Sequence, residues 1–300
     1  MLHLFKMLMT MLCALLGVAF LTLLERKLLS YMQIRKGPNK VGVAGIFQPF
    51  SDALKLFLKE LVIPFSSNKL LFISFPFLSL CIGLYLWGLL PSTYGTSIMG
   101  LSLMLFLCIS AINVYIVFGA GWASNSVYAF LGGLRASAQT ISYEISLVFV
   151  LLLPMSILLG LNFNTLLVGY PLVMLLLFSV MLWFISSLAE TNRAPFDFAE
   201  GESELVSGFN IEYGGGLFAL LFLGEYAIIL FLSMITSACF FSPNGLMSYI
   251  TIGFVVAVFF LVVRGVYPRF RYDKLMYLCW KTILPLSVSL LGLTYLSYWF

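Results

Sequence analysis

Very long stretches of this chain carry no charged side chain. The residues between Lys69 and Arg135 are all uncharged, and so are those from Ile145 to Ala189. A helix needs about 20 mostly apolar residues to cross the hydrocarbon core of a bilayer, so each stretch can hold two spans. Charged residues make up only 9% of the 300 residues, against roughly 25% in a soluble domain. Most of the surface must face lipid, which excludes a disordered, coiled-coil, nucleic-acid-binding or disulfide-stapled secreted protein.

We predict an all-α, polytopic membrane protein with eight transmembrane helices. The uncharged stretches are interrupted by turn-forming segments near Pro91–Gly100, Gly160–Pro171 and Phe241–Gly245. The chain is expected to form a single membrane domain over residues 1–300. Its approximate spans are 3–24, 70–90, 98–119, 136–158, 170–190, 216–239, 247–264 and 282–299.

The placement of charge supports an even number of spans. With eight spans, the odd-numbered connections hold fifteen of the 16 basic residues, including Arg135 and Arg193, and only Lys6 lies on the other side. The even-numbered connections carry no charge. Because basic loops stay on the cytoplasmic side or its organellar equivalent, we expect both termini to lie on the opposite side.

Residues 46–61 form the one apolar segment that is too charged to span. Apolar side chains recur there at three- and four-residue spacing, opposite Asp52, Lys55 and Lys59, which predicts an amphipathic helix lying in the membrane interface. A basic turn around Gly37-Pro38-Asn39 precedes it. This region favours either anchoring to anionic lipid or docking of another protein.

Histidine and cysteine give no indication of a metal site. The single histidine, His3, is near the N-terminus, and the five cysteines are far apart in apolar surroundings, unlike the close spacing of thiolate metal sites. We interpret the cysteines as small buried apolar residues. A redox centre held by this chain alone is therefore not expected.

Two carboxylates lie inside predicted spans. Glu144 belongs to the fourth span and Glu225 to the sixth. An ionisable group at such depth is costly and usually faces a polar interior where it serves a function. The alternative is a buried carboxyl held by a neighbouring hydroxyl group.

Six further acidic residues crowd one connection. Residues 189–213 carry them against the single cation Arg193, and phenylalanine, leucine and valine are interleaved among them. This mixture favours a packed segment over a solvated loop. Carboxylates so close together in poorly solvated surroundings cannot all ionise, so they should titrate as a coupled set.

Five segments together resemble a known family. They are LLERKLLSYMQIRKGPNKVG (23–42), QPFSDALKLFLKE (48–60), LRASAQTISYE (134–144), AETNRAPFDFAEGESELVSGFNIEY (189–213) and YPRFRYDKLM (267–276). The chain resembles the subunit 1 family of proton-translocating NADH:ubiquinone oxidoreductase, respiratory complex I, in its mitochondrially encoded form. It departs from the family pattern at Ser137 and at Gly214–Gly216.

The resemblance implies a role as well as a fold. It implies a core membrane subunit of the mitochondrial inner membrane, with odd loops in the matrix, that lines the ubiquinone tunnel and contacts the membrane and hydrophilic arms. Ubiquinone would be a substrate, phospholipid (cardiolipin being one candidate) a further partner, and NADH, FMN and iron–sulfur clusters would be held by partner subunits. The implied tunnel residues are Glu25, Arg26, Arg35, Asp52, Arg264, Arg269 and Arg271. The implied proton-coupling residues are Glu144, Glu190, Asp197, Glu200, Glu202, Glu204, Glu212 and Glu225.

The residues taken without the resemblance leave two other classes open. One is a secondary proton or ion transporter, which should have polar groups and broken helices in both membrane halves. The nearly uncharged even side offers no such outer pathway. The other is a structural anchor, which would have no use for Glu144 and Glu225 within the membrane.

Overall fold

The computed structural model describes residues 2–91, 101–158, 160–166, 171–173, 176–197, 208–243 and 245–297, and within these ranges all regular elements are helical. The α-helices are α1 (Leu2–Met32), α2 (Gln48–Leu58), α3 (Lys69–Trp87), α4 (Ser102–Ala123), α5 (Val127–Ile157), α6 (Phe163–Leu166), α7 (Leu177–Glu190), α9 (Gly215–Thr236), α10 (Leu246–Val266), α11 (Tyr272–Leu278) and α12 (Leu284–Ser297). The short 3₁₀-helices η1 (Val43–Gly45) and η2 (Gly208–Asn210) and the π-helical segments η3 (Ser237–Phe241) and η4 (Cys279–Ile283) complete them.

Seven helices in the described ranges are long and apolar enough to cross a membrane. They are Phe5–Met32, Lys69–Trp87, Ser102–Ala123, Val127–Ile157, Gly215–Phe241, Leu246–Val266 and Tyr272–Leu296. The remaining apolar helix, α7, has 14 described residues, fewer than the about 20 that a span requires. An eighth span therefore stays a prediction.

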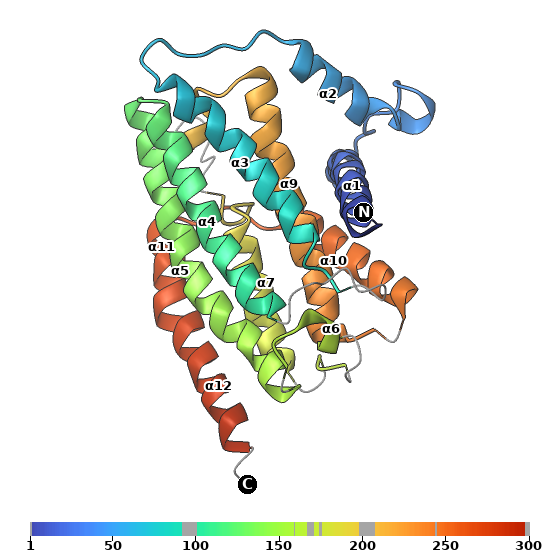
Figure 1. Cartoon of the computed structure of the whole chain (residues 1–300), viewed down its shortest axis with the longest axis vertical. Coiled ribbons are helices and arrows are strands. Elements are labelled where there is room, and N and C mark those ends of the chain that lie inside the picture. Colours follow the sequence, from blue (N-terminus) through green and yellow to red (C-terminus); the bar gives the residue numbers. More distant parts are fainter. Residues whose placement is uncertain are drawn as a thin grey trace.

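The helices form a bundle with α1 and α2 at one side (Figure 1). Helix α3 packs against α4 and α9, α5 packs against α4, α7 and α12, and α9 packs against α10. Figure 1 views α1 nearly end-on while α3, α4 and α5 run down the page, so α1 is steeply inclined to them. Helix α12 ends on the side of the molecule away from α2.

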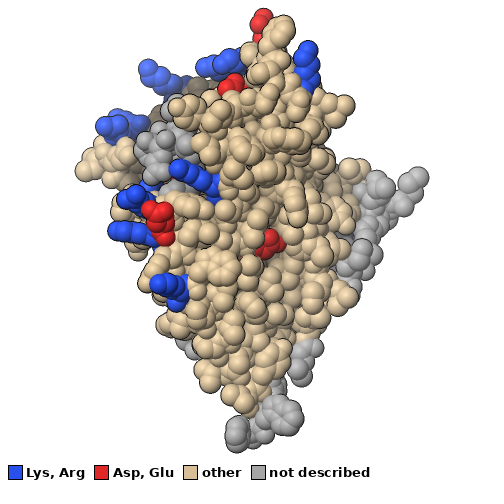
Figure 2. All heavy atoms as spheres, turned by 90° about the vertical axis from the view of Figure 1, so that its left-hand side faces the viewer, with Lys and Arg blue, Asp and Glu red and all other residues tan. Residues whose placement is uncertain are grey.

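Charged side chains gather toward one end of the bundle. On the face shown in Figure 2, lysine and arginine lie mainly over the upper part, and the tapered lower end shows only uncharged and undescribed residues. Such a division is typical of a membrane protein whose charged loops share one side.

Glycine permits a close contact between α3 and α9. A Cβ atom added to Gly224 of α9 would lie 3.0 Å from the backbone carbon and oxygen of Ser79 in α3, and one added to Gly83 would lie 3.0 Å from the carbonyl oxygen of Gly224. Because the neighbouring atoms are backbone, a side chain at either position would require the two helices to move apart by a few tenths of an ångström. The contact fixes α9 one residue before Glu225.

Two helices extend beyond the bounds expected for their spans, so some of the charges assigned to connections belong to helices. Helix α1 continues through Glu25 and Arg26, and α5 begins at Val127, so Arg135 is helical. In α1 the extension is possible because both charged residues have partners: Glu25 pairs with Arg264, and Arg26 pairs with Asp52. Glu144 therefore lies between four and five turns into its helix, roughly 17 residues from its start.

The interpretation of all five cysteines as buried is wrong for three of them. Cys239 and Cys279 are buried, whereas Cys13, Cys81 and Cys108 are exposed. A thiol behaves as a small apolar group, so it is as compatible with a lipid-facing helix surface as with a core.

Helix α2 has 11 residues, too few to cross a bilayer. Its Phe50, Leu54 and Phe57 are exposed, whereas Asp52 turns toward α1. The first residue of α9, Gly215, contacts the backbone just after α2. Gly215 has φ +58, and a Cβ atom added to it would lie 3.3 Å from the carbonyl oxygen of Glu60. Glycine adopts this left-handed conformation at little cost, so the glycine run that departs from the family pattern has a packing role here.

Candidate functional site

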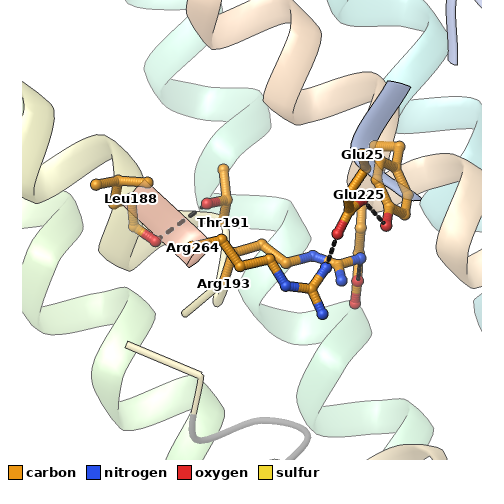
Figure 3. A network of polar contacts seen from close by, with 7 residues as sticks. Glu25, Leu188, Thr191, Arg193, Glu225 and Arg264 are labelled. Carbon is orange, nitrogen blue, oxygen red and sulfur yellow. Dashed lines mark hydrogen bonds and ion pairs between the residues drawn. The ribbon is translucent and has the colours of Figure 1, made fainter. Parts of the chain in front are cut away.

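Two ion pairs meet at the side chain of Tyr226 (Figure 3 shows the pairs and the adjoining loop). Arg264 of α10 pairs with Oε1 of Glu25 in α1, while the Tyr226 hydroxyl donates a hydrogen bond of 2.5 Å to the other oxygen, Oε2. In the second pair, Arg193 Nη2 lies 3.1 Å from Glu225 Oε2. Glu225 and Tyr226 are neighbours on α9, so one helix presents both groups.

The guanidinium of Arg193 also lies against two aromatic rings. Its Cζ is 4.5 Å from the ring centroid of Tyr226 and 5.2 Å from that of Phe222, within the range of cation–π attraction. Arg193 is only 7% exposed, and a cation at such burial is stable only when it is paired. The tyrosine thus joins the two ion pairs through its hydroxyl on one side and its ring on the other.

Two small cavities, each lined by polar as well as apolar side chains, lie beside the ion pairs. One of about 20 Å³ is lined by Glu25, Thr191, Arg193, Tyr226 and Arg264, among others. The other, of about 30 Å³, is lined by polar groups from α3, α4, α7 and α9. These are Ser79, Asn113, Glu190, Thr191, Asn192 and Glu225. Each cavity is large enough for a water molecule and has polar partners for it.

Glu190 and Glu144 continue the polar region away from Glu225. Glu190 ends α7 and lines the second cavity, and its Oε2 is buried without a hydrogen bond from any described residue. Glu144 of α5 is near enough to repel it electrostatically and accepts a 3.1 Å hydrogen bond from the Ser110 hydroxyl. The structure therefore brings Glu190 and Glu225 to one cavity and places Glu144 near Glu190.

Asp197 belongs to a different contact. Its carboxylate, 3% exposed, lies 3.1 Å from Arg269 Nη2. Beside it Phe196 stacks on Phe270 with a 5.6 Å centroid separation, and the Phe270 amide donates to the Pro195 carbonyl. These contacts hold the segment after α7 against the segment before α11.

The other predicted tunnel residues are more exposed. Arg26 Nη1 lies 2.5 Å from Asp52 Oδ2, with the arginine side chain 54% exposed. Arg35 is exposed after α1. Arg271 pairs with Asp273 at 3.2 Å on the surface, and both line an open cavity of about 490 Å³ with Arg135 and Tyr272. The structure brings only Glu25 and Arg264 of this set directly to the network around Tyr226.

The sequence of the chain matches one protein family over nearly its whole length. The family model described as NADH dehydrogenase matches residues 5–295. The chain belongs to this NADH dehydrogenase family. Among similar proteins is NADH-ubiquinone oxidoreductase chain 1 of Aedes aegypti, 50% identical over 289 residues, which cover 95% of this chain and 92% of the relative. The same-named proteins of Anopheles quadrimaculatus (51% identical, 95% and 92% covered) and Tetraodon nigroviridis (50% identical, 92% and 89% covered) are also similar.

The acidic segment of this NADH dehydrogenase family member is only partly described. Glu200, Glu202 and Glu204 lie outside the described residues. Glu212 is half-buried in the turn before α9, next to Tyr213, whose ring stacks on Phe72 at 4.2 Å. Burial raises the pKa of Tyr213, so its hydroxyl stays protonated and donates to the Ala120 carbonyl at 3.2 Å.

Several polar side chains at the centre of the site are absent from the predicted set. They are Ser79, Ser110, Asn113, Thr191, Asn192, Arg193 and Tyr226. Arg193 could have been found, because it is the one cation among six carboxylates of residues 189–213. Tyr226 could have been suspected only from its position beside Glu225, since tyrosine is common in apolar helices.

Proposed function

We propose that this chain is a core membrane subunit of proton-translocating NADH:ubiquinone oxidoreductase in the mitochondrial inner membrane. Family membership and the names of the similar proteins support the assignment. In this proposal the whole chain is one membrane domain, α7 together with the preceding residues is the eighth span, and α2 lies in the interface. The odd connections face the matrix, where the subunits that carry NADH, FMN and iron–sulfur clusters would bind.

The tunnel for ubiquinone would run past the ion pair Glu25–Arg264. This pair supports the proposal because a buried carboxylate and a partly buried guanidinium lie beside a small cavity between α1, α9 and α10. Polar groups of this kind can hold a quinone headgroup by hydrogen bonds. Arg26, Arg35, Asp52, Arg269 and Arg271 would lie along or near the same path.

The acidic cluster would couple quinone reduction to proton translocation. The single observation that carries this is the continuity of Glu25, Tyr226, Arg193 and Glu225, which joins a predicted tunnel residue to a predicted coupling residue. Reduction of a quinone consumes protons, so it changes the charge near Glu25. Because charges interact strongly in poorly solvated surroundings, that change would alter the pairing of Arg193 with Glu225 and the protonation of Glu190 and Glu144.

Purification in a mild detergent tests the assignment. The chain should elute in a very large assembly that carries NADH–quinone reductase activity and contains hydrophilic-arm subunits. A chain that elutes alone, as a secondary transporter would, and leaves the activity in other fractions contradicts the proposal.

A further inference from the structure

The buried amide of Gln139 binds both ends of the loop that carries Arg193. Its Nε2 donates two hydrogen bonds of 2.9 Å, one to the carbonyl oxygen of Ala189 and one to that of Phe196. Gln139 is fully buried in α5. Ala189 lies four residues before Arg193 and Phe196 three residues after it, so a single side chain closes the loop across its base.

The loop makes little regular structure of its own. Most of its backbone bonds are short-range, such as the Phe196 amide to the Arg193 carbonyl at 2.9 Å, and one is long-range, from the Phe270 amide to the Pro195 carbonyl at 3.0 Å. The ring of Tyr143, one turn along α5 from Gln139, packs near Phe196 at 6.2 Å, and its hydroxyl donates to the Leu275 carbonyl. One face of α5 therefore supplies the rigid support against which the loop is held.

Gln139 donates these two hydrogen bonds although its other polar atom, the amide oxygen, is left without a hydrogen bond among the described residues. Its Oε1 is buried and accepts no hydrogen bond from a described residue. An unsatisfied buried carbonyl opposes folding, so an apolar side chain of equal size would suit the core better if packing were the only requirement. What the amide alone supplies is two donors aimed at two carbonyl groups.

We propose that Gln139 is a positioning residue that fixes the Ala189–Phe196 loop, so that Glu190 and Arg193 enter the polar network from one rigid segment. The expected effect of Gln139 on quinone-linked turnover rests on the proposed function. The positioning of the loop by Gln139 does not depend on that function. Gln139 touches neither ion pair and acts only through the backbone of the loop.

The variants Gln139→Glu and Gln139→Met, studied in the assembled complex, separate hydrogen-bond donation by residue 139 from the size and shape of its side chain. A carboxylate at this position faces two carbonyl oxygens and repels them, whereas a protonated carboxyl can donate to one. For Gln139→Glu, quinone-linked turnover should fall about tenfold at pH 8, since two hydrogen bonds are lost, and should recover partly relative to the unmodified complex at pH 6. Gln139→Met should lower turnover equally at both pH values. Gln33→Glu, on an exposed residue after α1, is the matched control and should follow the unmodified pH profile.

Hydrogen–deuterium exchange of residues 189–197, compared with the unmodified complex at each pH, gives a readout independent of turnover. Exchange should rise in Gln139→Glu at pH 8 and fall back at pH 6, and it should rise at both pH values in Gln139→Met. Unchanged exchange in Gln139→Met, or a Gln139→Glu pH profile like that of Gln33→Glu, overturns the proposal. If Gln139→Glu does not assemble, the Gln139→Met exchange alone decides. Changed exchange with full turnover supports the positioning by Gln139 and contradicts the proposed function of the loop.

Discussion

Tyr226 and Glu25 are 201 positions apart in the chain, and the tyrosine hydroxyl donates a 2.5 Å hydrogen bond to the glutamate. The same tyrosine ring lies under the guanidinium of Arg193. Arg264 pairs with the other carboxylate oxygen of Glu25, and Glu225 pairs with Arg193. Charged side chains from α1, α9, α10 and the loop after α7 therefore lie around the Tyr226 side chain. We therefore expect a change at either ion pair to affect the other.

Replacement of Tyr226 by phenylalanine should separate the contribution of the hydroxyl group from that of the ring. The variant loses a hydrogen bond to a charged group, worth about 1.5–3 kcal/mol, but keeps the aromatic face for Arg193. We expect quinone-linked turnover to fall about tenfold or more, while NADH oxidation by an artificial acceptor is unchanged. Steady-state rates with the two acceptors measure this directly.

Tyr249→Phe is the matched control for that variant. Tyr249 is a buried tyrosine of α10 whose hydroxyl has no hydrogen-bond partner among the described residues. Its loss should leave both rates unchanged. Equal effects of Tyr226→Phe and Tyr249→Phe would show that the bond to Glu25 does not contribute to turnover.

Arg193 and Glu225 should show strong coupling in a double-mutant cycle. Removing one partner of a buried ion pair leaves an uncompensated charge and costs about 3–5 kcal/mol. We therefore expect Arg193→Gln to reduce the thermal stability of the assembled complex more than Arg193→Gln combined with Glu225→Gln. Additive losses would contradict a buried pair. Asp273→Asn, which breaks an exposed pair, should cost at most about 1 kcal/mol.

Gly224→Ala should disturb the site through the helix that carries it. The added Cβ would meet the backbone of Ser79 at 3.0 Å, so α9 must move away from α3 and take Glu225 with it. Lower thermal stability and lower quinone-linked turnover are expected. Gly292→Ala is the control, because nothing lies within 4 Å of its Cβ position and alanine favours a helix by about 1 kcal/mol over glycine. If the Gly224→Ala complex is as stable as the Gly292→Ala complex, the close contact of α3 with α9 is not required.

Membrane-impermeant labelling tests the eight-span arrangement. A cysteine introduced at Asn39, in the basic connection after α1, should react from the matrix side, and one introduced at Phe300 from the opposite side. We expect opposite sides because nearly all basic residues are assigned to odd-numbered connections, which stay on the matrix side. Reaction of both positions from the same side would contradict eight spans and exclude α7 as a span.

The sequence predicts the helical class and the three central carboxylates for simple physical reasons. Uncharged stretches of this length have few alternatives to membrane helices, and Glu144, Glu190 and Glu225 stand out because charge is so scarce. The lengths of α1 and α5 are not predictable in this way. A charged residue normally indicates the end of a span, but Glu25 and Arg26 remain helical because partners from α10 and α2 compensate them.

The role of uncharged residues in the network is hidden in the sequence for a different reason. Tyr226 lies in an apolar helix and Gln139 among small polar residues of α5, and only their distant partners show what they bind. A single sequence contains no information on which side chain meets Glu25 or Ala189. The sequence also groups Asp197 with the other carboxylates, whereas the fold turns it to Arg269.

The most direct test of the central claim is the separate measurement of quinone reduction and of proton pumping in Glu225→Gln and Glu144→Gln complexes. Each change keeps the shape of the side chain but removes its ability to ionise and to bind or release a proton. The account predicts that quinone reduction and pumping both fall, while oxidation of NADH by an artificial acceptor stays near normal. Glu60→Gln, at an exposed residue after α2, should leave all three unchanged. Full quinone reductase activity together with full pumping in both Glu225→Gln and Glu144→Gln would contradict the coupling role of the acidic cluster.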